Sequence, residues 1–309
     1  MTSSAAADAA KEGFSIRQRR RSGQALEGAM HCVFLVCGLS AVASVAFICI
    51  HVAVSGWPII AKYGLDFLLG QSWNPGNSQF GVLPMITASV AATAAAMVVA
   101  LPSGVLAAVF LAKIAPDRVS AVLRTFVDLL SGIPSVVYGL LGAILIVPKI
   151  FKIQSAAGLP AGGSLLAAAI MLAIMILPTI ISVSETALRA VPKQYEDASL
   201  ALGATKLQCV FKTTIPAAKS GITAGMALGI GRAAGEAMAV MMVAGNAAIM
   251  PSLLKPARLL TASIPIEWAY SSGVHREALY GIGLVLFVFI MALNITVRRI
   301  MKKGAGQGE

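Results

Sequence analysis

Residues 225–239 read Gly-Met-Ala-Leu-Gly-Ile-Gly-Arg-Ala-Ala-Gly-Glu-Ala-Met-Ala, and they place Arg232 and Glu236 inside an apolar run long enough to cross a bilayer. A charge at membrane depth costs about 2.5–3.5 kcal/mol on insertion scales. If the run is one helix, the two charges lie one turn apart and could neutralise each other as an i,i+4 ion pair. The alternative is that they line a substrate pathway, which is the default hypothesis for ionisable residues inside a membrane.

The composition identifies an integral membrane protein. Of the 309 residues, 58% are hydrophobic and only 12% are charged, whereas soluble domains carry about 25% charged residues. The net charge of +11 does not indicate nucleic-acid binding, because the basic residues flank apolar runs and no aromatic side chains are interleaved with them. The four cysteines form no CxxC pair, so the sequence predicts neither a disulfide framework nor a zinc site.

Apolar runs of spanning length predict an all-α integral membrane protein with about six transmembrane helices. Most of the 24 lysine and arginine residues fall in segments that are cytoplasmic if both termini are inside, so the positive-inside rule predicts that orientation. We divide the chain into a basic N-terminal tail (1–28), a six-span membrane domain (29–303) and a short C-terminal tail (304–309). The predicted spans cover about residues 31–54, 82–111, 125–147, 164–184, 222–245 and 278–297.

The segment 185–220 is the longest predicted cytoplasmic insert. Pro192 suits the start of a helix and Pro216 would end the helical run. An amphipathic stripe of this kind could lie on lipid headgroups or dock a soluble partner, and the pattern alone favours neither. The apolar residues that recur at helical spacing are Leu200, Ala204, Leu207 and Phe211.

A short motif in this insert resembles the coupling motif of the permease subunits of binding-protein-dependent ABC importers. In that family the motif reads Glu-Ala-Ala, three residues, Gly, nine residues, Ile, one residue, Leu-Pro. Here Asp, Ser, Thr and Ile replace the Glu, the second Ala, the Ile and the Leu, and the spacing is kept. The resemblance implies that this loop is a coupling helix that sits in a cleft of an ATPase subunit. The residues carrying it are Asp197, Ala198, Ser199, Gly203 and Pro216.

Two further stretches resemble signatures of permeases of phosphate-specific transport (Pst) systems: LSGIPSVVYG at 130–139 and GRAAGEAMAV at 231–240. The loops 73–81 and 260–275 are more similar to PstC subunits than to their PstA partners. The resemblance covers roughly residues 60–300 and implies a bundle like that of a type I ABC importer permease. In the first stretch we interpret five residues as a structural or gating motif: Gly132, Pro134, Ser135, Tyr138 and Gly139.

The resemblance also implies partners in the cytoplasmic (inner) membrane: a second, PstA-like permease, a PstB-like ATPase dimer and a PstS-like extracytoplasmic phosphate-binding protein. The chain contains no Gly-Lys dipeptide and therefore no Walker A phosphate loop, so we expect ATP hydrolysis on another polypeptide. We expect the chain to be a transport subunit rather than an enzyme. We also expect it to bind no cofactor, no metal and no nucleic acid, and to contact membrane lipid.

Phosphate is a charged oxyanion, and its passage through hydrocarbon needs a compensating cation. The guanidinium of Arg232 stays protonated, and its fork of donors suits a tetrahedral oxyanion. Glu236 could hold Arg232 between transport events and so keep binding transient. We therefore hypothesise that both residues line the path at the interface with the partner permease.

Three other functions are weighed against this hypothesis. A permease for molybdate, tungstate or sulfate stays open, because one arginine does not distinguish tetrahedral anions. A membrane enzyme would need a nucleophile with a base, a carboxylate pair or metal ligands in the spans, and the sequence has no His-Glu-x-x-His. A stand-alone channel would have no use for the amphipathic insert.

Overall fold

The computed structural model describes residues 2–160 and 162–305. By the density of its internal contacts the chain divides into residues 1–54 and residues 55–309. The first unit is the greater part of one long helix, α1 (Thr2–Tyr63). The predicted tail 1–28 is therefore helical from Thr2 onward, whereas residues 306–309 of the predicted C-terminal tail lie outside the described residues.

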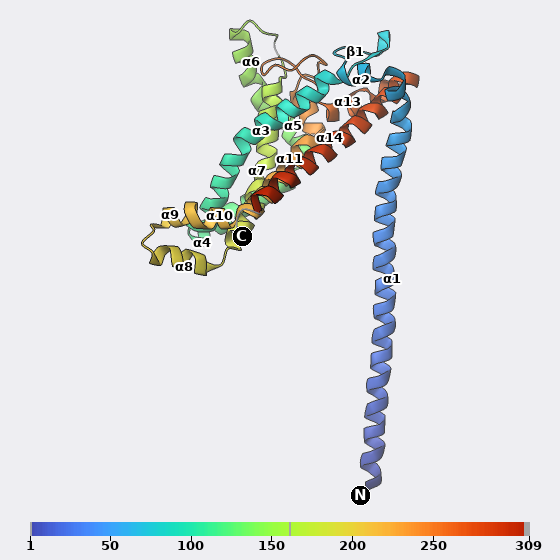
Figure 1. The fold of residues 1–309 in the computed structure, drawn as a ribbon, viewed down its shortest axis with the longest axis vertical. Helices are drawn as coiled ribbons and strands as arrows, with labels where there is room; N and C mark the ends of the chain where they lie inside the picture. The colour runs from blue at the N-terminus through green and yellow to red at the C-terminus, as the bar shows by residue number, and fades with distance from the viewer. Residues whose placement is uncertain (1, 161, 306–309) are drawn as a thin grey trace. The chain divides into compact units, whose positions relative to one another are not determined.

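The second unit is built around α7 (Leu165–Arg189), whose apolar window is the most buried of the candidate spanning helices. It packs against α3 (Leu83–Val109) and α11 (Lys219–Gly235), as Figure 1 shows. Small residues spaced four apart form the buried face of α3, and such a face lets a neighbouring helix approach closely. The residues of this face are Ala88, Ala92, Ala96, Ala100, Gly104 and Ala108.

Within the described residues, five helices are long and apolar enough to span a bilayer, and they confirm the prediction of an all-α membrane bundle. The predicted third span is wrong at its start, because α4 (Asp117–Gly132) ends before Pro134 and the spanning stretch begins only at Ser135. The predicted span 222–245 is interrupted, since it is divided between α11 and α12 (Met238–Val243). The five helices are Met30–Tyr63, Leu83–Ile114, Ser135–Ala156, Leu165–Arg189 and Gly273–Thr296.

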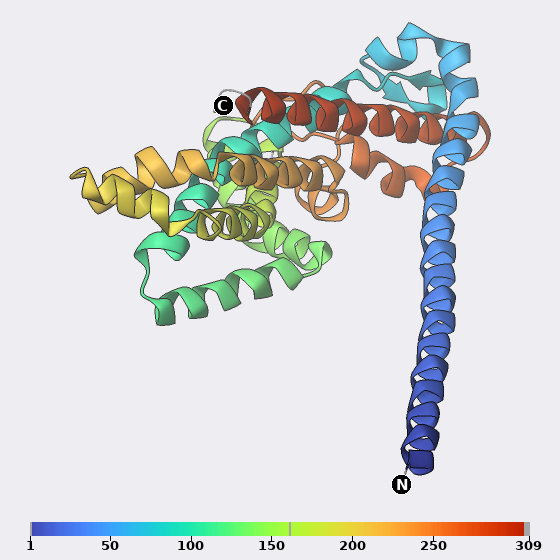
Figure 2. The same ribbon diagram turned by 60° about the horizontal axis from the view of Figure 1, so that its bottom comes forward.

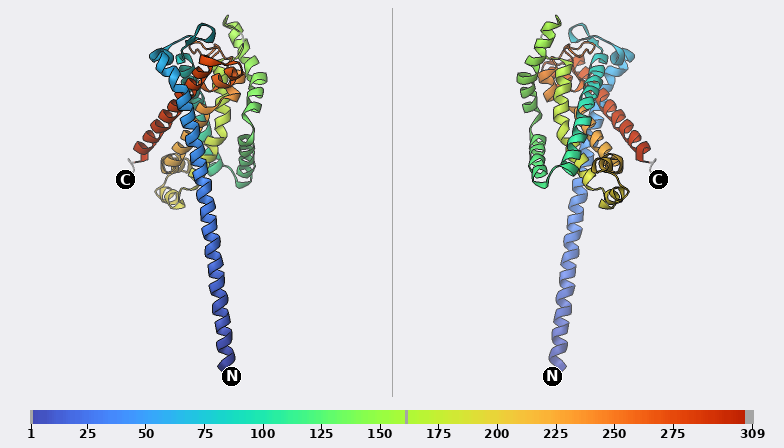
Figure 3. Two further views of the ribbon diagram at one scale, coloured as in Figure 1. Left: turned by 90° about the vertical axis from the view of Figure 1, so that its right-hand side faces the viewer. Right: turned by 90° about the vertical axis from the view of Figure 1, so that its left-hand side faces the viewer.

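The second unit carries different structures at its two ends. One end holds short elements that lie between the spans, including two strands of two residues that pair antiparallel with Trp73 opposite Phe80. The other end holds α8 (Lys193–Ala201), α9 (Lys206–Cys209) and α10 (Ile215–Ala217), which project from the bundle in Figures 2 and 3. The elements of the first end are α2 (Leu65–Leu69), β1 (Trp73–Asn74), β2 (Gln79–Phe80) and α13 (Leu260–Glu267).

The remaining segments connect these helices. Three short π-helical turns lie within or beside longer helices of the described chain: η2 (Phe110–Ile114), η3 (Gly142–Ile146) and η4 (Val210–Thr214). The other connecting elements are η1 (Pro75–Asn77), α5 (Ser135–Leu141), α6 (Val147–Ala156), η5 (Trp268–Tyr270) and α14 (Gly273–Ala305).

Candidate functional site

The helix that carries Arg232 ends before it reaches Glu236. Residue Gly235 is the last of α11, and Glu236 has extended backbone angles, φ −73° and ψ 126°. The helix is therefore interrupted between Arg232 and Glu236, and the two residues are not one turn apart on a single helix as expected. An interrupted helix inside an apolar bundle leaves backbone groups free, and neighbouring elements must satisfy them.

The two charged side chains bond to different elements. The Arg232 Nη1 group donates a hydrogen bond to the hydroxyl of Thr179 on α7 at 3.0 Å. The Glu236 carboxylate accepts from the backbone N–H of Ala239 at the start of α12, also at 3.0 Å. The carbonyl of Glu236 accepts from the Thr261 hydroxyl of α13 at 2.6 Å. The i,i+4 ion pair weighed from the sequence is therefore absent from the ion pairs of the described residues.

The stretches 130–139 and 231–240, which resembled family signatures, pack against each other as α5 and α12. A Cβ added at Gly139 would lie 2.9 Å from the Ala239 Cα and 2.8 Å from the Met242 sulfur, so only glycine allows this approach. The Tyr138 hydroxyl donates to the carbonyl of Leu130 at 2.7 Å and so bridges the break before α5.

The other residues of the first stretch shape that break. The carbonyl of Pro134 accepts from the N–H of Val137, which starts the helix that follows, and Ser135 is the first residue of α5. Gly132 closes α4, and a Cβ there would meet nothing within 4 Å. Among the described residues, no hydrogen bond joins these residues to Arg232, whose guanidinium bonds to Thr179.

Replacing Gly139 by alanine is expected to destabilise the contact between α5 and α12. The added methyl group meets the backbone of Ala239 as well as the Met242 side chain, and the backbone cannot move aside easily. Overpacking of this kind costs about 1–3 kcal/mol. The measurement is the thermal unfolding midpoint of the purified protein. The control is Gly132→Ala, seven residues earlier, where the structure leaves open space. Equal midpoints for the two variants would show that the close contact at Gly139 does not limit stability.

The insert 185–220 folds as two antiparallel pieces rather than as one helix. The α8 helix ends at Ala201, Gly203 adopts φ +87°, and a new helix starts after Thr205. The hydroxyl of Thr205 and the side chain of Gln208 form a capping box at this second start. The predicted continuous stripe is therefore wrong, because the glycine turn reverses the chain between Leu200 and Leu207. The turn nevertheless leaves large apolar side chains exposed: Tyr195, Leu200, Leu202, Leu207 and Phe211.

One motif residue of the insert, Ser199, contacts the segment that returns from the turn. The Thr213 hydroxyl donates to the hydroxyl of Ser199 at 3.2 Å, which ties the two pieces together. Asp197 and Ala198 are exposed, as are Gly203 at the turn and Pro216 within α10. An exposed, partly apolar knob that is internally bonded can present a defined surface to another protein.

A partly buried network joins this insert to the bundle, and sequence reasoning missed it. The Lys113 ammonium pairs with Glu196 of α8 at 2.5 Å, and Glu196 also accepts from Thr214. Lys113 belongs to η2, which continues α3. The ion pair therefore ties α8 to the end of α3.

A second network lies at the same end, around the buried carboxylate of Glu185 on α7. It accepts from Arg124 of α4 and from Arg189 of its own helix, at 2.5 and 2.9 Å. Arg189 also donates to the Ser120 hydroxyl and to the carbonyl of Leu111. The hydrogen bond and the charge of Glu185 hold the pKa of Arg124 above its ordinary value. The i,i+4 spacing of Glu185 and Arg189 was a usable signal for this site.

At the opposite end, four separate segments meet at the carboxylate of Glu267. The indole N–H of Trp73 donates to both carboxylate oxygens, at 3.1 and 2.9 Å, and His275 Nε2 lies 2.8 Å from Oε2. Arg258 forms an ion pair with the same carboxylate and also donates to the carbonyl of Asn246 at 2.9 Å. We call Trp73, Arg258, Glu267 and His275 the Glu267 cluster. Trp73, Glu267 and His275 come from the two loops whose resemblance was noted in the sequence, Arg258 lies two residues before the second loop, and the structure brings all four together.

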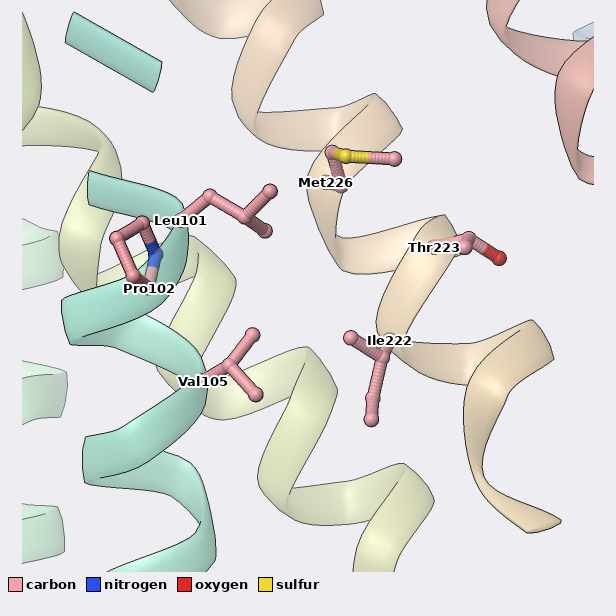
Figure 4. A pocket seen from close by; sticks show the side chains of 6 residues that line it. All are labelled: Leu101, Pro102, Val105, Ile222, Thr223 and Met226. Atoms are coloured by element: carbon pink, nitrogen blue, oxygen red, sulfur yellow. The ribbon is translucent and has the colours of Figure 1, made fainter. Parts of the chain in front are cut away.

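A groove of about 380 Å³ separates α3 from α11, and Figure 4 shows Leu101 and Val105 of α3 facing Ile222 of α11 across it, whereas Thr223 points away from α3. Its one hydroxyl, that of Thr223, is already bonded to the carbonyls of Lys219 and Ser220. The groove therefore offers no polar group to a hydrated anion and is not a path for one. Its lining residues are Leu101, Pro102, Val105, Ile222, Thr223 and Met226.

Comparisons with known proteins agree with this architecture. A family model of binding-protein-dependent transport system inner membrane components matches residues 100–303. A probable ABC transporter permease of Bacillus subtilis, YqgH, is 36% identical across 95% of this chain and 98% of its own length. The phosphate transport system permease PstC of Mesorhizobium japonicum is 34% identical across 82% of this chain and 83% of its own.

Solved structures with a similar fold are also ABC transporter components. A chain of the methionine transporter MetNI in an inward-facing conformation covers 72% of this chain with a TM-score of 0.53 and 21% identity, and 94% of that chain is matched. A chain of a bacterial alginate ABC transporter, in complex with its alginate-bound periplasmic protein, covers 81% of this chain and 88% of its own, with a TM-score of 0.56 and 15% identity. At such identities the likeness concerns the fold alone.

Proposed function

Because the chain belongs to the family of binding-protein-dependent transport system inner membrane components, we propose that it is the transmembrane permease subunit of an ATP-driven phosphate importer and forms half of the translocation path. A permease of this family is a transport component and not a catalyst. The relatives named PstC support phosphate as the transported ion. The chain is a multi-pass protein of the inner membrane, and we infer from its basic loops that both termini are cytoplasmic.

The observation that carries the proposal is the hydrogen bonding of Arg232. Its guanidinium is held by a neutral hydroxyl, and no carboxylate of the described chain pairs with it. A positive charge left uncompensated inside an apolar bundle is costly, and a passing oxyanion would offset that cost. Arginine suits this role because its fixed charge and several donors match the oxygens of phosphate.

Glu236 acts, in this proposal, as a second element of the path. Its carboxylate is engaged by the N–H of Ala239 at the start of α12, so it does not cancel the charge of Arg232 in the present conformation. If the break between α11 and α12 closes during the cycle, the Glu236 carboxylate approaches Arg232 and competes with phosphate for the guanidinium. Phosphate is then released as the carboxylate takes its place on Arg232.

The insert 185–220 is the proposed coupling segment to a separate ATPase dimer. Its exposed apolar tip, where Leu202 is 89% exposed, offers a surface that needs a partner. The bonded knob is attached to α3 through Lys113 and Glu196, so ATP-driven movement of the partner would reach the spanning helices. The complete importer would add a second, PstA-like permease and a PstS-like binding protein. We expect this chain to contribute no cofactor.

The decisive experiment is ion selectivity of the assembled importer. Cells or vesicles that contain the complex are expected to take up labelled phosphate, with sulfate and molybdate transported at least tenfold more slowly when each anion is supplied at the same concentration. The measurement is initial uptake rate with and without ATP. Preferential uptake of molybdate, tungstate or sulfate would show that this anion, and not phosphate, is the substrate, and the permease role would stand. Uptake that does not depend on ATP would overturn the importer proposal.

A further inference from the structure

The hydroxyl of Thr179 is the hydrogen-bond partner that the described structure gives to Arg232, at 3.0 Å from Nη1. We propose that Thr179 is a positioning residue: it orients the guanidinium of Arg232 toward the translocation path without neutralising it. The inference rests on the proposed function, because it assigns Thr179 to the same path.

The packing of α7 against α11 fixes this contact. A Cβ at Gly229 would lie 3.1 Å from a side-chain carbon of Ile180, which follows Thr179 in α7. Gly229 is three residues before Arg232, and residues at this spacing lie on neighbouring positions of one helix face. The close approach of the two helices at Gly229 therefore brings the hydroxyl of Thr179 within reach of the guanidinium.

A threonine suits this role better than a carboxylate would. Its hydroxyl oxygen accepts one hydrogen bond and carries no net charge. It can therefore fix the direction of the Arg232 guanidinium without neutralising the positive charge of that group. Its branched side chain has few rotamers in a helix, which limits where the oxygen can lie. A guanidinium has five N–H donors, and one bond to Thr179 leaves the others for an oxyanion.

The experiment compares Thr179→Val with Thr179→Ser in the complete importer reconstituted with its partners and with phosphate-loaded binding protein. Valine keeps the shape and removes the acceptor, whereas serine keeps the acceptor. The measurement is the number of phosphate ions imported per ATP hydrolysed. Loss of a hydrogen bond to a charged group changes an equilibrium constant by a factor of about ten or more. We therefore expect the valine variant to lower the ratio of phosphate imported to ATP hydrolysed about tenfold, and the serine variant to keep most of the original ratio.

A matched control is Thr223→Val, on the same helix as Arg232 and nine residues before it. The hydroxyl of Thr223 bonds to the carbonyls of Lys219 and Ser220 in its own helix at 2.9 and 2.8 Å, and we expect no change in the ratio. A purely structural role for Thr179 would instead lower uptake and ATP hydrolysis in parallel, and that result would overturn the inference. An unchanged ratio in the valine variant, or a serine variant as defective as valine, would also overturn it.

The variant Arg232→Gln in the same assay separates this inference from the proposed function. If Arg232→Gln stops uptake and Thr179→Val leaves the ratio unchanged, the proposed function stands and the positioning role of Thr179 fails. If Arg232→Gln imports phosphate at the normal ratio, the function proposed for the arginine itself fails.

Discussion

Replacing Arg232 by glutamine is expected to lower phosphate uptake between tenfold and a hundredfold. Glutamine keeps a donor that can reach the Thr179 hydroxyl but removes the positive charge. A hydrogen bond to a charged group contributes about 1.5–3 kcal/mol, and the loss of one such bond to phosphate corresponds to a decrease of this size in uptake. The measurement is the initial uptake rate in cells that depend on this importer, normalised to the amount of assembled complex.

Arg232→Lys is the control for this experiment. It keeps the charge but loses the planar fork, so we expect uptake between that of the original protein and that of the glutamine variant. Uptake by Arg232→Gln at the original rate, with the complex present at its normal amount, would show that the path does not use this charge. The same rate in the lysine and glutamine variants would show that charge is not what the position supplies.

Replacing Glu267 by glutamine is expected to lower the unfolding midpoint of the complex by about 5 °C or more. The carboxylate of Glu267 accepts from three side chains, whereas glutamine has one acceptor oxygen and turns an N–H₂ group toward at least one of these donors. The cluster is largely buried, with 15% of the Glu267 side chain exposed. A buried donor left without an acceptor costs about 1–3 kcal/mol, and each kcal/mol shifts the midpoint by about 2–4 °C in a chain of this size.

Glu277→Gln provides the comparison for Glu267→Gln. Glu277 is exposed and lies two residues after His275, so the same chemical change there is expected to leave the midpoint within about 1 °C. Both are measured by thermal unfolding of the purified complex in one detergent. Equal midpoints would mean that the Glu267 cluster does not stabilise this end of the protein.

Much of the bundle could be predicted because its signal is local. Runs of apolar residues define the spanning helices directly, and the small residues of α3 mark a helix-packing face. The division of the span 222–245 could not be predicted in this way, because hydropathy is continuous through residues 235–240. Only one of the two bonds that hold Glu236 at the end of α11 is local, the one from the N–H of Ala239. The other comes from Thr261 of α13, 25 residues later.

The insert shows a second limit of periodicity. Leu200, Leu207 and Phe211 keep helical spacing, yet Gly203 turns the chain between the first two. A glycine in a helical pattern carries a weak signal, since it is tolerated in helices and favoured at turns alike. The networks around Glu185 and Glu267 were also hard to predict, apart from the i,i+4 pair of Glu185 and Arg189, because their longest hydrogen bonds join residues 78 and 194 positions apart.

The division of α11 from α12 has a consequence for biogenesis. A segment that carries an arginine and a break is a poor substrate for insertion by the translocon as an independent helix. The Thr179 hydroxyl, on the helix synthesised before it, supplies a partner for that arginine. We therefore expect this segment to enter the bilayer together with α7 rather than after it, so the pair forms an early unit of assembly.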